Sequence, residues 1–275
     1  MRRRRRRRAV RQCRHRCACE APAAAGHAAA FPLSSLVGRI ASGRGNPPRG
    51  AHVTYSMHPA ARRRCEVRHL AKKLSKAAAA AQLEALRKRA AGCRDCPLWE
   101  NATQTVFGEG DARAPIMIVG EQPGDVEDRE GHPFVGPAGR ILTQGLDEAG
   151  IDRRHVYITN AVKHFKWEPR GKRRLHKSPA QREIEACYQW LESEMQAVQP
   201  KLVVALGATA AKVLLGPRFR ITQGRGEVQR REGLPDVIAT YHPSFLLRIK
   251  TRPEGDEAYG QFVDDLRAAS RYLQD

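Results

Sequence analysis

A histidine set among cations is the feature of this chain that most clearly suggests chemistry. Residues 171–177 read Gly-Lys-Arg-Arg-Leu-His-Lys, so His176 has four Lys or Arg neighbours. Fixed positive charges disfavour protonation of an imidazole, and a neutral imidazole can act as a base or a nucleophile. A basic loop also suits nucleic-acid phosphate, and the expected phosphate contacts are Lys172, Arg173, Arg174 and Lys177. The alternative is a solvated basic loop without chemistry.

Further polar residues that could take part in chemistry follow short apolar runs. Glu121 and Gln122 lie in a Gly-Glu-Gln-Pro-Gly turn, where the carboxylate could orient a water or stabilise a developing cation. His242 could donate a hydrogen bond to a developing oxyanion. Ser244 could cap a helix whose backbone N–H groups attract phosphate. Each of these residues has an ordinary structural alternative in a satisfied loop or turn.

Phe134 lies in the stretch Gly131–Gly139, which is rich in glycine and proline. A proline before it and a Gly-Pro pair shortly after it favour a rigid ring that could stack on a flat ligand. The alternative is a phenylalanine of the hydrophobic core.

Three cysteines in the C-terminal two thirds of the chain suggest a metal site. Cys93 and Cys96 form a Cys-x-x-Cys pair, and Cys187 lies on an expected helix that could return to the same place. His164 could supply a fourth ligand. Such a set is typical of zinc, iron–sulfur or redox chemistry, and ordinary buried cysteines are the alternative.

Alternating strand and helix signals predict the elements that must position these residues. Apolar runs predict strands, and periodic or capped segments predict helices. We expect strands at 115–120, 156–160, 202–206 and 236–241, and helices at 68–91, 139–149, 178–198, 208–215 and 256–273. Apolar strands separated by helices predict a three-layer α/β/α fold with a central four-stranded parallel sheet. Ligands of such sheets bind beyond the carboxyl ends of the strands, where Glu121, Asn160 and His242 are expected.

The net charge of +20 is concentrated at the N-terminus. Residues 1–90 hold 23 of the 49 Lys and Arg residues and 3 of the 29 Asp and Glu residues, so the rest of the chain is balanced. Residues 1–66, rich in Arg and Ala, predict a disordered extension or a misassigned start, and 67–275 predict one domain. Because no apolar run reaches the length of a membrane span, we expect no membrane association and a cytoplasmic location.

Four segments, in order, resemble family 4 of the uracil-DNA glycosylase superfamily. They are Gly120–Gly124, Gly131–Gly139, Asn160–Lys163 and His242–Arg248, and the resemblance spans about residues 85–273. Gln122, together with the segment Lys172–His176, further resembles the UdgX subgroup. Proteins of that subgroup bind uracil-containing DNA and become covalently attached to it through the loop histidine.

The resemblance implies a role for each candidate residue. Phe134 would stack on a flipped-out uracil, Asn160 would read its Watson–Crick edge, and His242 would stabilise charge on a uracil oxygen. Glu121 would take the polar catalytic place and His176 would be the nucleophile; Gln122 and Ser244 complete the expected substrate site. A [4Fe–4S] cluster would be bound by Cys93, Cys96 and Cys187, with His164 where ordinary family 4 proteins have a cysteine.

These expectations amount to uracil excision followed by covalent capture of the deoxyribose. The expected partner is uracil-containing DNA, preferably single-stranded, and the expected assembly is a monomer. One alternative is an ordinary family 4 glycosylase that uses water and turns over. The other is a non-catalytic DNA-binding protein that acts through its basic N-terminal third.

Overall fold

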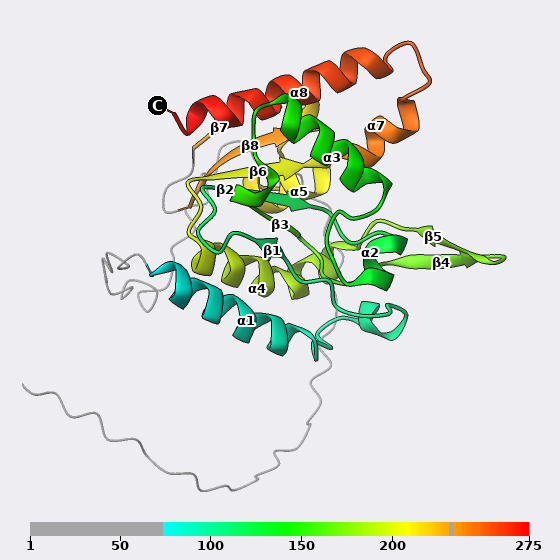
Figure 1. Cartoon of the computed structure of the whole chain (residues 1–275). Helices are drawn as coiled ribbons and strands as arrows, with labels where there is room; N and C mark the ends of the chain where they lie inside the picture. Colours follow the sequence, from blue (N-terminus) through cyan, green and yellow to red (C-terminus); the bar gives the residue numbers. More distant parts are fainter. Residues whose placement is uncertain (1–73, 231–233, 275) are drawn as a thin grey trace, which may run out of the picture. The chain divides into compact units, whose positions relative to one another are not determined.

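The computed structural model describes residues 74–230 and 234–274, so the predicted extension over residues 1–66 lies outside the described part. A mixed sheet lies between two groups of helices (Figure 1). Its strand order is β1-β3-β2-β6-β8-β7. The four inner strands are β3 (Val156–Asn160), β2 (Ile116–Gly120), β6 (Leu202–Leu206) and β8 (Asp236–Thr240). They run parallel to one another, as predicted.

Two short edge strands were not predicted. The strands β1 (Glu109–Gly110) and β7 (Val228–Gln229) pair antiparallel with β3 and β8. The described sheet therefore has six strands rather than four. Two-residue strands are too short to produce an alternating pattern, which is why the sequence did not indicate them.

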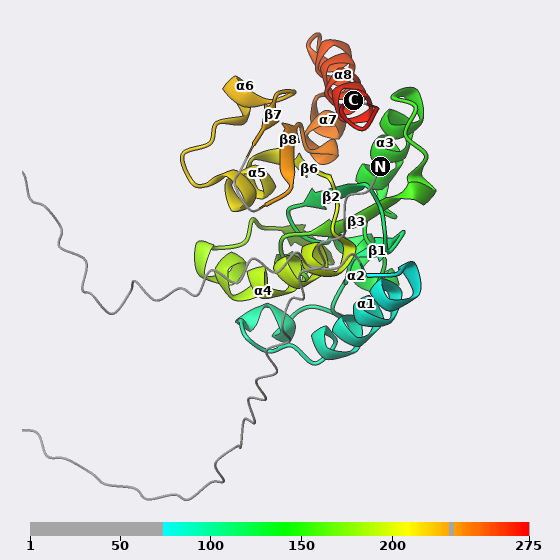
Figure 2. The same ribbon diagram turned by 90° about the vertical axis from the view of Figure 1, so that its left-hand side faces the viewer.

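Both faces of the inner strands are buried, because successive side chains point to opposite sides of the sheet. Met117 and Val119 of β2 pack in one apolar cluster, and Ile116 and Ile118 pack in the other. The first cluster is covered by α1 (Lys76–Ala90), α4 (Gln181–Val198) and α5 (Gly207–Leu215). The second is covered by α3 (Pro137–Glu148), α7 (Pro243–Ile249) and α8 (Gly255–Tyr272) (Figure 2). The predicted three-layer α/β/α class is confirmed.

Smaller elements connect these layers. They are η2 (Pro97–Glu100), α2 (Asp125–Glu130), η3 (Arg153–His155) and α6 (Ile221–Gly224). None of the helices in the described residues is long and apolar enough to cross a membrane.

The start of α4 differs from its prediction. The helix was expected from residue 178, but it begins at Gln181 with Ala180 as the N-cap. The carboxylate of Glu183 accepts the backbone N–H of Ala180 at 2.6 Å. A carboxylate in the first turn satisfies an otherwise unpaired N–H and favours the positive end of the helix dipole.

The basic segment predicted to be a loop is a β-hairpin. The strands β4 (Trp167–Arg170) and β5 (Arg173–His176) pair with each other, and Trp167 lies opposite His176. Gly171 adopts a left-handed conformation at the turn, with φ of 59°, which glycine tolerates without steric cost. This hairpin projects from the sheet beside α2 (Figure 1). His176 therefore ends a hydrogen-bonded strand rather than lying in a free loop.

Candidate active site

The carboxyl ends of the parallel strands bring the predicted residues together. Gly120 ends β2 and lies directly opposite Asn160, which ends β3. A Cβ atom at Gly120 would collide with Asn160 Oδ1 and would lie 2.6 Å from the ring of Phe134. The absence of a side chain at Gly120 therefore allows the Asn160 amide and the Phe134 ring to pack against the end of β2.

Asn160 and Phe134 both line a cavity of about 410 Å³. Its lining includes Gln122, Glu127, Phe134, Asn160, Leu175, His176, His242, Ser244 and Arg248. Two polar atoms of the lining, Asn160 Oδ1 and His242 Nε2, are buried and have no hydrogen-bond partner within the described residues. Because an unpaired buried polar atom is costly, these two atoms indicate where a polar ligand would bind.

Phe134 forms an apolar wall of this cavity. The residue is 6% exposed and has a φ of 54°, a left-handed conformation that is uncommon outside glycine. Its carbonyl accepts a hydrogen bond from Arg153 Nη2 at 3.2 Å, which helps to hold this backbone conformation. The ring centroid lies 6.0 Å from that of His242. The arrangement suits a flat ring bound between Phe134 and the polar atoms.

The tautomer of His242 follows from its contacts. Its Nδ1 accepts the backbone N–H of Ser244 at 3.1 Å, so in the neutral ring the proton is on Nε2. Burial, aided by the nearby His176 and Arg248, lowers the pKa of His242 from 6.5 to about 4. At neutral pH the ring is uncharged and directs an N–H donor into the cavity.

The position of His176 is fixed by contacts with Gln122. The Gln122 amide nitrogen donates to the carbonyls of Lys166 (3.2 Å) and Lys177 (3.0 Å) and lies 2.9 Å from His176 Nε2. The amide NH2 has two N–H groups for these three acceptors, so one N–H is shared; because the amide nitrogen only donates, the facing Nε2 carries no proton and the ring proton is on Nδ1. Gln122, predicted to bind substrate, thus anchors the hairpin that carries His176.

The pKa of His176 is lowered, as predicted, but its main cause differs from the prediction. The residue is exposed overall, yet its ring lies against Phe165, with centroids 5.9 Å apart. Burial of the ring is the largest contribution; Glu121 opposes it and Arg248 adds to it. The free base is therefore the main form at neutral pH.

Glu121 lines a second cavity, of about 390 Å³, which shares His176 with the first. Its carboxylate accepts a hydrogen bond from Thr209 Oγ1 at 2.5 Å. His176, His242 and Arg248 line both cavities. His176 thus lines both the 410 Å³ cavity beside Phe134, here called the base-sized cavity, and the cavity that contains the Glu121 carboxylate.

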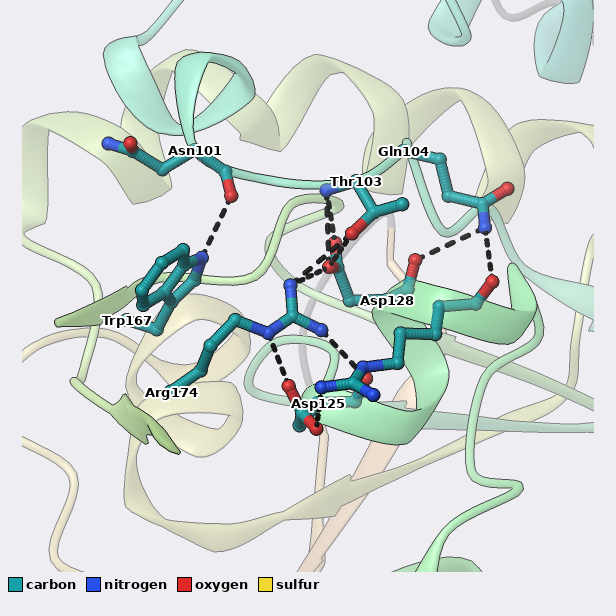
Figure 3. A network of polar contacts seen from close by, with 8 residues as sticks. Asn101, Thr103, Gln104, Asp125, Asp128, Trp167 and Arg174 are labelled. Atoms are coloured by element: carbon teal, nitrogen blue, oxygen red, sulfur yellow. Dashed lines mark hydrogen bonds and ion pairs between the residues drawn. The ribbon is translucent and has the colours of Figure 1, made fainter. Parts of the chain in front are cut away.

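Arg174 does not point toward solvent, and its prediction as a phosphate contact has to be corrected. Its guanidinium donates to the carboxylates of Asp125 and Asp128, with Nη1 2.6 Å from Asp128 Oδ2 (Figure 3). It also lies over the ring of Trp167, 5.5 Å from the centroid. Asp128 is fully buried and is bonded by the backbone N–H and hydroxyl of Thr103 as well. Arg174 fastens the hairpin to α2.

We expect Arg174→Ala to lower the free energy of unfolding by about 3 kcal/mol, because it leaves Asp128 buried without its cation. The neighbouring Arg173 is exposed, so Arg173→Ala should change stability by no more than about 0.5 kcal/mol. Arg173→Ala should instead reduce the slope of the logarithm of DNA affinity against the logarithm of salt concentration by about one. Urea unfolding and DNA titrations at several salt concentrations measure both effects. Equal stability of the two variants would contradict this assignment.

The other three expected phosphate contacts remain on the surface of the hairpin. Lys172 and Arg173 are exposed at the turn, and Lys177 is half-exposed with its ammonium 2.8 Å from Glu168. Because that ion pair is solvent-exposed, it contributes little to stability.

The cysteines lie where α1, η2 and α4 meet. Burial raises the pKa of Cys187 to about 12, and the proximity of Cys96 and Cys93 adds to the effect. N–H groups point at two of the sulfurs: the backbone of Lys163 donates to Cys187 Sγ and the Trp190 indole donates to Cys93 Sγ, each at 3.2 Å. In the described residues, no group of three or more His, Cys, Asp or Glu side chains is close enough to hold a metal ion. His164 is buried, with Nε2 2.9 Å from Thr105 Oγ1.

Glu127, Leu175 and Arg248 are lining residues for which the sequence predicted no role. Glu127 is buried and accepts the backbone N–H of Gly136 at 2.8 Å, so it shapes the turn that leads from Phe134 into α3. Leu175 is 43% exposed at the mouth of the base-sized cavity. Arg248 lies four residues after Ser244 on α7, a helical spacing that could have indicated a shared face.

Comparison with known proteins agrees with this geometry. Residues 107–267 match the uracil DNA glycosylase superfamily. A type-4 uracil-DNA glycosylase of Thermotoga maritima is 38% identical over 193 residues, which cover 70% of this chain and 95% of that protein. A second type-4 enzyme, of Sulfurisphaera tokodaii, is 39% identical over 173 residues, covering 60% and 76%. A type-5 enzyme of Pyrobaculum aerophilum is 34% identical over 154 residues, covering 50% and 64%. The chain therefore belongs to the uracil DNA glycosylase superfamily and is a relative of its type-4 enzymes.

Proposed function

We propose that this uracil-DNA glycosylase excises uracil from DNA and then traps the deoxyribose on His176. The observation that carries uracil recognition is the pair of unpartnered buried atoms, Asn160 Oδ1 and His242 Nε2, in the cavity beside Phe134. Its type-4 relatives are named for uracil-DNA glycosylase activity. Single-stranded uracil DNA is the proposed substrate, because a base outside a duplex has no pairing to lose.

The polar atoms of the cavity fit the edge of uracil. Uracil presents an N3–H donor between two carbonyl acceptors, and the amide of Asn160 can accept from N3–H while donating to a carbonyl. The N–H of His242 can donate to the remaining carbonyl. Phe134 then stacks on the ring, a contact that any flat base gains. The hydrogen bonds distinguish uracil from cytosine, which has an acceptor at N3.

Cleavage separates charge across the two cavities. When the bond from C1′ to N1 breaks, its electron pair goes to uracil, and the N–H of His242 stabilises the resulting anion. The sugar carbon becomes electron-poor, and the carboxylate of Glu121 stabilises it from the second cavity. Arg248, which lines both cavities, can bind the phosphate beside the reacting sugar.

Capture by His176 is favoured by its place and its charge state. The ring lies between the two cavities and is a free base at neutral pH. Its Nε2 lone pair, which accepts from Gln122 at rest, would form the bond to C1′ while the Nδ1 proton passes to Glu121. A nucleophile held in place reacts as if present at an effective concentration of about 10⁵ M or more, which allows it to compete with water.

An ordinary turnover reaction is the second candidate. The carboxylate of Glu121, held by Thr209, could orient a water toward the same carbon. His176 would then serve only to close the site. The third candidate is a DNA-binding protein without catalysis. It gives no role to the two unpartnered buried atoms, Asn160 Oδ1 and His242 Nε2.

A denaturing gel separates these possibilities. The protein is mixed with oligonucleotides that contain uracil, thymine or an abasic site, each single-stranded and in duplex. We expect an SDS-resistant adduct with uracil DNA alone, formed faster on the single strand. Free uracil released over many turnovers without an adduct would support the water reaction, and binding that ignores uracil would support the non-catalytic reading.

We propose further that Cys93, Cys96 and Cys187 bind a [4Fe–4S] cluster, with His164 as the fourth ligand. N–H groups directed at two of the sulfurs suit thiolate ligands, whose hydrogen bonds tune such clusters. When bound, the cluster would fasten α1 to α4 and supply no group to the base-sized cavity.

Cys187→Ser is expected to abolish iron binding and the brown colour of the purified protein, and to lower its unfolding temperature. The loss of a buried ligand removes folding energy that comes with metal binding. Iron analysis, visible absorbance and thermal unfolding measure this. Cys65→Ser, outside the proposed ligand set, serves as the control. A Cys187→Ser protein with unchanged iron content would contradict the ligand assignment.

A further inference from the structure

A buried ion pair contacts the backbone of Asn160, the residue proposed to read the base. Lys163 Nζ is 2.6 Å from Glu194 Oε2, and the two side chains are 1% and 0% exposed. The same ammonium donates to Thr159 Oγ1 at 2.6 Å and to the backbone carbonyl of Asn160 at 2.7 Å. All three donors of the ammonium are therefore used, and one of them holds Asn160.

The carboxylate of Glu194 is equally well satisfied. It accepts the backbone N–H of Gly108 at 2.9 Å, the hydroxyl of Tyr157 at 3.1 Å and the hydroxyl of Thr159 at 2.9 Å. The network joins α4 to β3 and to the segment before β1. A buried network in which every member is paired rigidifies its surroundings.

The main chain around Asn160 is held from both sides. On the side of β2, the N–H of Ala161 donates to Gly120 O at 2.9 Å and that of Val162 donates to Glu121 O at 3.0 Å. On the other side only the Lys163 ammonium contacts the Asn160 carbonyl among the hydrogen bonds of the described residues. The backbone of Lys163 is fixed separately, through Cys187 and Val106. Changing its side chain thus removes one support of Asn160 and leaves the turn in place.

Stability alone does not account for such a pair. A buried ion pair is often no more stabilising than apolar residues of the same shape, whereas a displacement of about 1 Å in a reading group can cost about 100-fold in rate. We propose that Lys163 and Glu194 position Asn160 and thereby set the affinity of the base-sized cavity for uracil. This inference rests on the uracil excision proposed above.

The test uses Lys163→Met/Glu194→Gln, which removes both charges together. Either change alone would leave an unpaired buried charge, whereas the amide that replaces the Glu194 carboxylate can still accept from Gly108 and donate to Thr159. The readouts are inhibition of excision by free uracil, the single-turnover excision rate at saturating DNA, and binding of DNA without uracil. Asn160→Ala is measured alone and combined with the double variant.

In Lys163→Met/Glu194→Gln, we expect free uracil to bind about 10-fold more weakly and excision to slow by about 10- to 100-fold. Binding of DNA without uracil should not change. Because Lys163 acts through Asn160, adding the double variant to Asn160→Ala should slow excision by less than about 2-fold, so the effects are not additive. Leu266→Ala, a core truncation on the buried face of α8, controls for lost stability and should leave the affinity for free uracil unchanged.

The inference would be overturned if the rate losses of Asn160→Ala and of the double variant multiplied in the combined variant, or if the affinity for free uracil did not change. Should the neutral pair not fold, Glu194→Asp keeps both charges, draws the ammonium away from Asn160 and should weaken free uracil binding in the same direction. The wild-type protein is assayed in parallel. If it releases no uracil, the proposed function fails; if it does and the variants behave like Leu266→Ala, only the positioning role fails.

Discussion

Serine in place of His176 is expected to abolish the SDS-resistant adduct while uracil excision continues. The smaller side chain removes the nucleophile and opens the junction between the two cavities to water. Water then completes the reaction, the protein is released, and excision proceeds over many turnovers. The measurement is a denaturing gel for the adduct combined with quantitation of released uracil under excess DNA.

His155→Ser is the matched control for this change, since His155 is an exposed histidine of η3 outside both cavities. It should form the adduct at the wild-type rate. Persistence of the adduct in His176→Ser would show that another side chain forms the bond. Loss of both the adduct and uracil release would instead give His176 a part in excision itself.

Replacing His242 with alanine is expected to slow excision by about 100- to 1000-fold at saturating DNA, the usual cost of removing a donor to a developing anion. The affinity for DNA without uracil should hardly change, because His242 lies inside the base-sized cavity. Single-turnover excision rates and DNA titrations give the two quantities. A loss of less than about 10-fold would place the main stabilisation of the leaving group elsewhere.

The pH dependence gives an independent check on His242. Its pKa in the folded protein is about 4, below the ordinary 6.5, because burial disfavours the charged ring. The neutral donor form therefore persists as pH falls through 6.5, and excision should not decline at that point on account of His242. The unfolded chain takes up the proton near pH 6.5, so between about 6.5 and about 4 this histidine makes the folded state less stable as pH falls.

The central strands could be predicted because each is short, apolar and bounded by turn residues. Their parallel order then predicted which polar residues meet, and Asn160 and His242 do line one cavity. Arg174 shows what a linear pattern misses. Its neighbours are cations, but its partners Asp125 and Asp128 lie almost 50 residues earlier in the chain, and only the fold brings them together.

The burial of side chains is the second property that the sequence alone did not predict. The basic neighbours of His176 predicted a neutral ring through charge, yet packing of the ring contributes most. Likewise, Gln122 was predicted to be a substrate contact, and its bonds to the Lys166 and Lys177 carbonyls became visible only once the hairpin was placed. Lys163 and Glu194 are 31 residues apart, and nothing in either sequence neighbourhood indicates their pairing.

The hairpin of β4 and β5 forms its own two-stranded sheet and shares no strand pairing with the main one. The group proposed to trap the sugar thus lies on a hairpin that side chains such as Gln122 and Arg174 hold in place, whereas the groups proposed to read and release the base lie at the ends of strands of the main sheet. Because β3 and β8, whose carboxyl ends place Asn160 and His242, do not pair with β4 or β5, we expect excision to survive changes that abolish trapping.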